Sequence, residues 1–111
     1  MREPARDKGR IEDMLQAINY INEFTAEIEY NQLVSDKMRY FAVVKNLEII
    51  GEAAYMLTKE FIATHSQTPW NVIIKMRHVL VHGYTNIEPA VLWDTIQNDL
   101  PPLKSQLESY L

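Results

Sequence analysis

Cysteine is absent from the chain of 111 residues, and glycine is scarce, with three residues. The absence of cysteine excludes a disulfide scaffold, thiolate-bound zinc, an iron–sulfur cluster and a thiol nucleophile. It also suits a reducing compartment, and we expect a cytoplasmic protein. With so few glycines, tight hairpin turns between strands are hard to place, which favours helices over a sheet.

Long hydrophobic runs are missing as well. No stretch approaches the roughly 20 apolar residues that a membrane span needs, and the first ten residues contain no apolar run of a signal peptide. We therefore expect a soluble protein with no membrane contact. Hydrophobic residues still make up 47% of the chain and charged residues 23%, enough to bury about 65% of the unfolded surface. This composition excludes an intrinsically disordered chain.

Charge of either sign is modest, and the net charge is −4. The first ten residues hold four basic and two acidic side chains, so the remainder is acidic. We interpret residues 1–111 as a single domain in which residues 1–6 form a flexible basic arm. An acidic body is not typical of proteins that bind nucleic acid over a broad basic surface. Any contact with RNA would need a local site.

Apolar residues recur at helical spacing throughout, and this pattern predicts an all-α fold, an antiparallel bundle of four to five helices. The predicted helices run over about 7–28, from a cap at Ser35 to Phe61, from Thr68 and Pro69 to Gly83, and from 87–89 to the end with a kink or break at Pro101 and Pro102. The connections at 29–35, 62–68 and 83–88 are short, as expected between antiparallel neighbours.

Gly51 lies inside the second predicted helix, where glycine costs roughly 1 kcal/mol relative to alanine. We expect a close approach of another helix or of a second subunit at this position. Simple tolerance of one glycine is the alternative.

The third predicted helix carries a polar stripe of Asn71, Lys75, His78 and His82, and Arg77 falls among its apolar positions. A guanidinium there cannot lose its proton and must find an anion or reach water. One interpretation is an ion pair with Glu48 or Glu52, and the other is a binding site for phosphate.

His82 lies just before Gly83, where the C-terminal end of the helix dipole favours imidazolium, the form needed in a general acid. Capping of the last carbonyls is the alternative. His78 and His82 are spaced so that they can share a metal, but only His65 stands in a nearby loop as a third ligand. We predict neither a metal nor a cofactor. Glu48 and Glu52 share a helix face near Lys45 and are interpreted as a solvated or ion-paired ridge, with a carboxylate dyad as the alternative.

Five segments in the same order resemble the HepT-like branch of the HEPN superfamily: GEAA (51–54), TPW (68–70), RHVLVHGY (77–84), VLWDTI (91–96) and LPPLK (100–104). The most specific match is Arg77, four further residues, His82, Gly83 and Tyr84, which follows the Arg-x4-His-x-Tyr pattern of the branch. The resemblance covers nearly the whole chain.

The resemblance implies a helical HEPN bundle, usually a homodimer that brings two Arg/His motifs to a shared cleft. It implies a metal-independent ribonuclease that acts as the toxin of a toxin–antitoxin pair. The antitoxin would be a minimal nucleotidyltransferase that silences the toxin by transferring AMP to the motif tyrosine. By position, Arg77 and His82 are the catalytic pair and Tyr84 is the AMP acceptor, with His78 and Glu52 as supporting residues. His78 departs from the family, which commonly has Asn there.

Such an enzyme needs few groups, because the 2′-OH of RNA attacks the adjacent phosphorus. His82 suits proton transfer and Arg77 suits a cation that binds phosphate oxygens. No metal is needed, and 2′,3′-cyclic phosphate ends are expected. However, positions five apart on a helix point about 140° away from each other, so either the last turn unwinds or the site pairs residues across a dimer. A catalytically inactive HEPN module that binds a nucleotide or a partner is the alternative function, and a plain structural dimer is a third.

Overall fold

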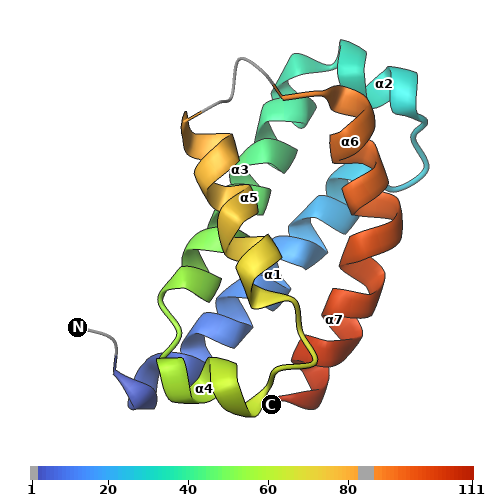
Figure 1. Cartoon of the computed structure of the whole chain (residues 1–111). Helices are drawn as coiled ribbons and strands as arrows, with labels where there is room; N and C mark the ends of the chain where they lie inside the picture. Colours follow the sequence, from blue (N-terminus) through green and yellow to red (C-terminus); the bar gives the residue numbers. More distant parts are fainter. Residues whose placement is uncertain (1–2, 83–86) are drawn as a thin grey trace.

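The computed structural model describes residues 3–82 and 87–111, and these residues form helices and no strands. In chain order the elements are η1 (Pro4–Arg6), α1 (Asp7–Thr25), α2 (Tyr30–Ser35), α3 (Lys37–Tyr55), α4 (Lys59–Thr64), α5 (Trp70–His82), α6 (Pro89–Asp94), the π-helical segment η3 (Thr95–Asp99) and α7 (Leu100–Ser109). Figure 1 shows a bundle of the long helices α1, α3 and α5 and the rod that runs from α6 to α7. The predicted all-α bundle is confirmed.

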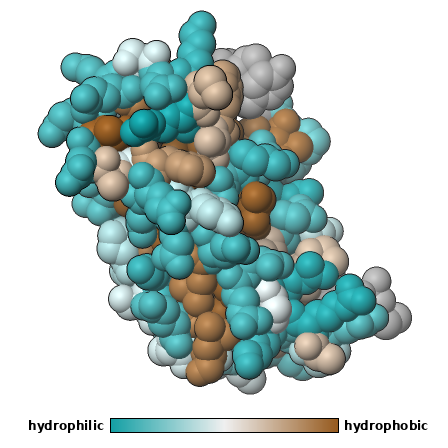
Figure 2. Space-filling model, turned by 180° about the vertical axis from the view of Figure 1, so that it is seen from behind, coloured by the Kyte–Doolittle hydropathy of each residue, from teal (hydrophilic) through white to brown (hydrophobic). Residues whose placement is uncertain are grey.

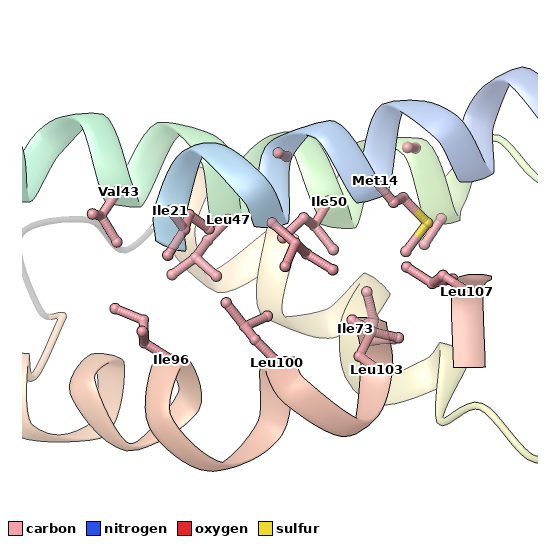
Figure 3. Close-up of a cluster of buried hydrophobic side chains, with 14 of the residues drawn as sticks. Met14, Ile21, Val43, Leu47, Ile50, Ile73, Ile96, Leu100, Leu103 and Leu107 are labelled. Carbon is pink, nitrogen blue, oxygen red and sulfur yellow. The ribbon is translucent and has the colours of Figure 1, made fainter. Parts of the chain in front are cut away.

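The core lies where α1, α3, α5 and the α6–α7 rod face one another. Figure 3 shows side chains from these elements pointing toward a common centre. Its fully buried members include Met14 and Ile21 of α1, Leu47 and Ile50 of α3 and Leu107 of α7. Each such side chain contributes about 1.5–3 kcal/mol through its burial. The face seen from behind in Figure 2 is largely hydrophilic, with a narrow strip of hydrophobic side chains.

The first helix is shorter than predicted. It ends at Thr25, whose hydroxyl donates to the Ile21 carbonyl (2.8 Å). Ala26 is extended, and Glu27 has a φ of 60°, a left-handed conformation that interrupts an α-helix. Ile28 fits the helical spacing but packs on the core from the connection that follows.

The predicted helix from Ser35 to Phe61 is wrong, because α2, α3 and α4 occupy the region from Tyr30 to Thr64. Ser35 ends α2, and the side chain of Asp36 caps α3 by accepting from the Arg39 amide (3.1 Å). The apolar spacing runs on past the end of α3 because Leu57 is buried in the same core.

A buried contact between distant residues fixes the break between α3 and α4. The backbone N–H and the hydroxyl of Thr58 donate to the two carboxylate oxygens of Asp7 (3.0 and 2.7 Å). The same hydroxyl oxygen accepts from the Phe61 amide (3.2 Å) and so caps α4. The turn is therefore held by Asp7 of α1, a residue 51 positions away in the sequence.

The start of α5 agrees with the prediction, but Thr68 acts differently. Its buried hydroxyl donates to Oε1 of Gln106 (2.9 Å) and contacts the Tyr110 hydroxyl, both on the C-terminal part of the chain. The indole N–H of Trp70 donates to the His65 carbonyl (2.9 Å). These bonds tie the connection before α5 to the end of the rod.

The helix with the two prolines continues past them. Its regular α form is interrupted in η3, where the Leu100 amide donates to the Thr95 carbonyl, five residues back. Pro101 and Pro102 then occupy the first turn of α7. The missing amide of Pro101 is therefore accommodated by a π-helical segment in the preceding residues, and Figure 1 shows α6 and α7 as one curved rod.

The N-terminal residues that the structure describes continue toward α1. Pro4–Arg6 forms a 3-10 turn, and Arg6 pairs with Glu3 (3.2 Å).

None of the helices in the described part of the chain is both long and apolar enough to cross a membrane.

Candidate active site

The contact of α3 with α5 positions Arg77, and Gly51 makes this contact possible. A Cβ atom on Gly51 would overlap Cβ of Arg77, and it would lie 3.0 Å from Cα of Arg77 and 3.1 Å from the Ile73 carbonyl oxygen. Two of these atoms are backbone and the third is fixed to it, so they have little room to move. The expected close approach at Gly51 is thus a helix–helix contact within the chain.

Arg77 points from α5 toward α3. Its Nε lies 2.5 Å from Oε2 of Glu52, and its Cζ lies 5.3 Å from the centre of the Tyr55 ring. The side chain is 28% exposed, against 52% for Glu52. Nε itself is buried, and the ion pair lacks the geometry of a hydrogen bond. Of the two predicted partners Glu52 makes the ion pair, whereas Glu48 pairs with Lys45 (3.6 Å).

This arrangement leaves Arg77 able to receive a second anion. The guanidinium is held by one carboxylate that is half exposed, so the pair is open to solvent on the Glu52 side. An incoming phosphate can therefore compete with Glu52 for Arg77. The stacking of a cation on an aromatic face, here Tyr55, keeps the guanidinium in place without neutralising its charge.

His78 and His82 lie together on the outer face of α5. Their ring centres are 4.6 Å apart, and the ring planes are inclined by 50°. Both side chains are exposed, as are those of Asn71 and Lys75, so the predicted polar stripe is confirmed. His82 is the last residue of α5.

Arg77 and His82 are not brought together within one chain. Arg77 contacts Glu52 and Tyr55 of α3, whereas His82 contacts His78. The angular separation expected for positions five apart is therefore retained to the end of α5.

The remaining predicted positions are Gly83, Tyr84 and His65. Gly83 and Tyr84 fall outside the described residues. His65 follows α4, at the opposite end of the bundle from the end of α5 (Figure 1), and its ring stacks on Phe61 with centres 3.9 Å apart. In the part of the chain that the structure describes, no three His, Cys, Asp or Glu side chains gather closely enough to hold a metal ion.

The model of the family described as ribonuclease HepT-like matches residues 14–110. The chain belongs to this HepT-like family. A protein of Thermococcus cleftensis named "Probable ribonuclease HepT" is 41% identical over 91% of this chain and 92% of its own length. Proteins named "Putative RNase" from Methanocaldococcus jannaschii and Caldanaerobacter subterraneus subsp. tengcongensis are 35% and 37% identical over 91% of this chain, and over 93% and 90% of their own lengths. No solved structure matches significantly.

All the predicted site positions of this HepT-like chain lie inside the matched range. Sequence reasoning missed Tyr55, although its position gave a signal: it follows Gly51 by one helical turn on α3 and therefore faces the same neighbour.

A second feature that the sequence did not reveal is an apolar groove between α5 and the α6–α7 rod. Two cavities of about 440 and 290 Å³ lie along it and share Met76 and Thr95 as lining residues. Leu47 and Ile50 of α3 line its floor.

The α5 side of this groove is an apolar stripe of Val72, Met76 and Val79. Met76 is half-buried, whereas Val72 and Val79 are exposed by 67% and 53%. On a helical wheel this stripe is next to the stripe that carries Lys75 and His82. The groove therefore borders the candidate active site.

Proposed function

We propose that this chain is a metal-independent endoribonuclease, with Arg77 and His82 as its catalytic pair. One observation carries the proposal. In a chain of the HepT-like family, Arg77 is held ready by Glu52 and Tyr55 while an exposed imidazole pair ends the same helix. The arrangement offers a fixed cation for phosphate and groups that transfer protons.

The proposed reaction uses the substrate's own nucleophile. The 2′-oxygen of a ribose bonds to the adjacent phosphorus, and the bond from phosphorus to the 5′-oxygen breaks. A base takes the 2′ proton, and His82 gives a proton to the departing 5′-oxygen. Arg77 stabilises the charge on the phosphorane oxygens. The products are a 2′,3′-cyclic phosphate and a 5′-OH.

We further propose a homodimer in which the α5 face of each copy meets the α6–α7 side of the other. Contiguous apolar surface of this kind is uncommon on monomers. A dimer with twofold symmetry would bury this surface on both copies. Charge complementarity supports a second copy as the occupant, because Lys75 borders the stripe and Glu88 and Asp99 line the rod side of the groove. We propose that the dimer pairs Arg77 of one copy with His82 of the other, because the two side chains have different neighbours within one chain.

We expect light scattering at micromolar concentration to report a dimer and Val79→Asp to report a monomer, because a carboxylate cannot be buried unpaired in an apolar interface. The rate of RNA cleavage by Val79→Asp should fall because the dimer is lost. The matched control is Val34→Asp, an exposed valine of α2 that does not line the groove. A monomeric wild type, or a Val79→Asp protein that stays dimeric, would contradict the proposed interface.

We also propose that the ribonuclease is a cytoplasmic toxin that a nucleotidyltransferase antitoxin silences by transferring AMP to Tyr84. Tyr84 follows His82 by two positions in the sequence. AMP at this position would add a bulky group and a negative phosphate that competes with RNA for Arg77. Inhibition of this kind requires no refolding.

Intact-mass spectrometry after co-expression with a neighbouring nucleotidyltransferase should show adducts of AMP mass on the wild type and none on Tyr84→Phe. The control is Tyr20→Phe, which removes an exposed phenol from α1 and should leave the adducts in place. Adducts that map to another residue, or silencing of Tyr84→Phe by modification, would exclude Tyr84 as the acceptor.

The alternative function is a catalytically inactive HEPN module that binds a nucleotide or a partner. It is favoured by the ion pair that already holds Arg77 within the chain. Incubation of the purified protein with RNA in EDTA decides between the two. Cleavage that persists in EDTA and leaves cyclic phosphate ends supports the enzyme, whereas intact RNA supports the inactive module.

A further inference from the structure

The imidazole that lies next to His82 within the chain is that of His78. The rings are 4.6 Å apart on the exposed face of α5, one helical turn from each other. Arg77 precedes His78 in the sequence but is directed to Glu52 and Tyr55 on α3. The exposed end of α5 therefore presents a pair of histidines, and the arginine approaches from another side of the helix.

We propose that His78 is a second catalytic residue, the base that accepts the proton of the 2′-OH, while His82 is the acid. This inference rests on the proposed ribonuclease function and deepens it. The 2′-oxygen bonds to phosphorus as its proton passes to a neutral nitrogen of His78. The bond to the 5′-oxygen breaks as this oxygen takes a proton from the His82 imidazolium. Exchange with water then returns both rings to their starting forms.

The chemistry of the neighbouring side chains supports this division. A base needs a nitrogen with a free lone pair, and a neutral imidazole has one, whereas guanidinium and ammonium groups do not. This excludes Arg77 and Lys75 as acceptors. Glu52 is engaged with Arg77 on the α3 side of the helix. His82 is the last residue of α5 and lies beside His78, so it is the second imidazole available to serve as the acid.

Asparagine distinguishes a base from a mere support at position 78. An amide can donate and accept hydrogen bonds as an imidazole does, but its nitrogen does not take up a proton near neutral pH. If His78 transfers a proton, His78→Asn should reduce cleavage by about 10²–10⁴-fold. Asn71→Ala removes another exposed polar side chain from the same stripe. It should leave the order of magnitude of the rate unchanged and serves as the control.

A substrate with a different leaving group distinguishes the acid from the base. Once the wild-type cleavage site is mapped, the 5′-oxygen at that linkage is replaced by sulfur in a synthetic RNA, since a thiolate departs without a proton. His82→Ala should be slow on the oxygen substrate and recover most of the wild-type rate on the sulfur substrate. His78→Asn and His78→Ala should stay slow on both. Circular dichroism of each variant checks that the fold is retained.

The outcomes distinguish this inference from the proposed function. If the wild type cleaves RNA and His78→Asn cleaves it at a rate within about threefold of the wild type, His78 is not the base. The proposed ribonuclease function would then be unaffected. If the cleavage rate of His78→Asn recovers on the sulfur substrate, His78 is the acid and not the base. This result would overturn the proposed assignment. A wild type that leaves RNA intact would overturn both the proposed function and this inference.

Discussion

Replacing Gly51 with alanine is expected to lower the melting temperature by several degrees and to reduce RNA cleavage. The added Cβ would overlap Arg77 and crowd the Ile73 carbonyl. Overpacking of this kind costs about 1–3 kcal/mol, although alanine gains up to about 1 kcal/mol over glycine inside a helix. The strain falls directly on Arg77, so activity and stability should fall together. Calorimetry at a fixed protein concentration measures the effect.

Gly9→Ala is the matched control for this change. Gly9 lies in α1, and a Cβ there would have nothing within 4 Å. The same substitution should therefore stabilise the protein by roughly 0.5–1 kcal/mol. Equal melting temperatures for the two variants would show that α3 and α5 do not need their close approach, and the account of how Arg77 is positioned would fail.

Removing either member of the proposed catalytic pair is expected to have the largest effect on activity. His82→Ala should lower the cleavage rate by about 10²–10⁴-fold, the usual contribution of a general acid. Arg77→Ala should lower it by about 10²–10³-fold, as expected for loss of one group that stabilises developing charge. Rates are measured on labelled RNA in EDTA, and circular dichroism confirms that each variant is helical.

Two further variants isolate the role of Arg77. Lys59→Ala removes one exposed positive charge from α4, away from the candidate site and the groove, so it corrects for a general loss of attraction to RNA. Glu52→Gln removes the carboxylate that competes with phosphate but leaves Arg77 over Tyr55, and it should retain or increase RNA binding. Unfolding of Arg77→Ala would instead assign the arginine to the α3–α5 contact, and full activity of His82→Ala would exclude it as the acid.

The sequence predicted those parts of the fold that depend on local patterns. The apolar spacing and the Pro69 start placed α5, and a glycine inside a helix indicated the close approach at Gly51. The break between α3 and α4 was missed because it depends on Asp7, which binds Thr58 from a distant part of the chain. Apolar spacing alone carries no information about such a contact.

The sequence predicted which residues form the candidate site but not how their side chains are arranged. The sequence left open whether Arg77 pairs with Glu48 or Glu52, because the choice depends on how α3 and α5 are placed against each other. Their packing selects Glu52 and adds Tyr55. The angular separation of Arg77 and His82 followed from helix geometry alone, and the structure retains it.

We propose that this chain cleaves RNA through the substrate's own 2′-OH. The most direct test uses an RNA in which a single 2′-OH, at the mapped cleavage site, is replaced by hydrogen, with cleavage followed in EDTA. We expect this linkage alone to become resistant while unmodified RNA still yields a 2′,3′-cyclic phosphate. Cleavage at the deoxy linkage would show that another nucleophile attacks the phosphorus and would rule out this mechanism.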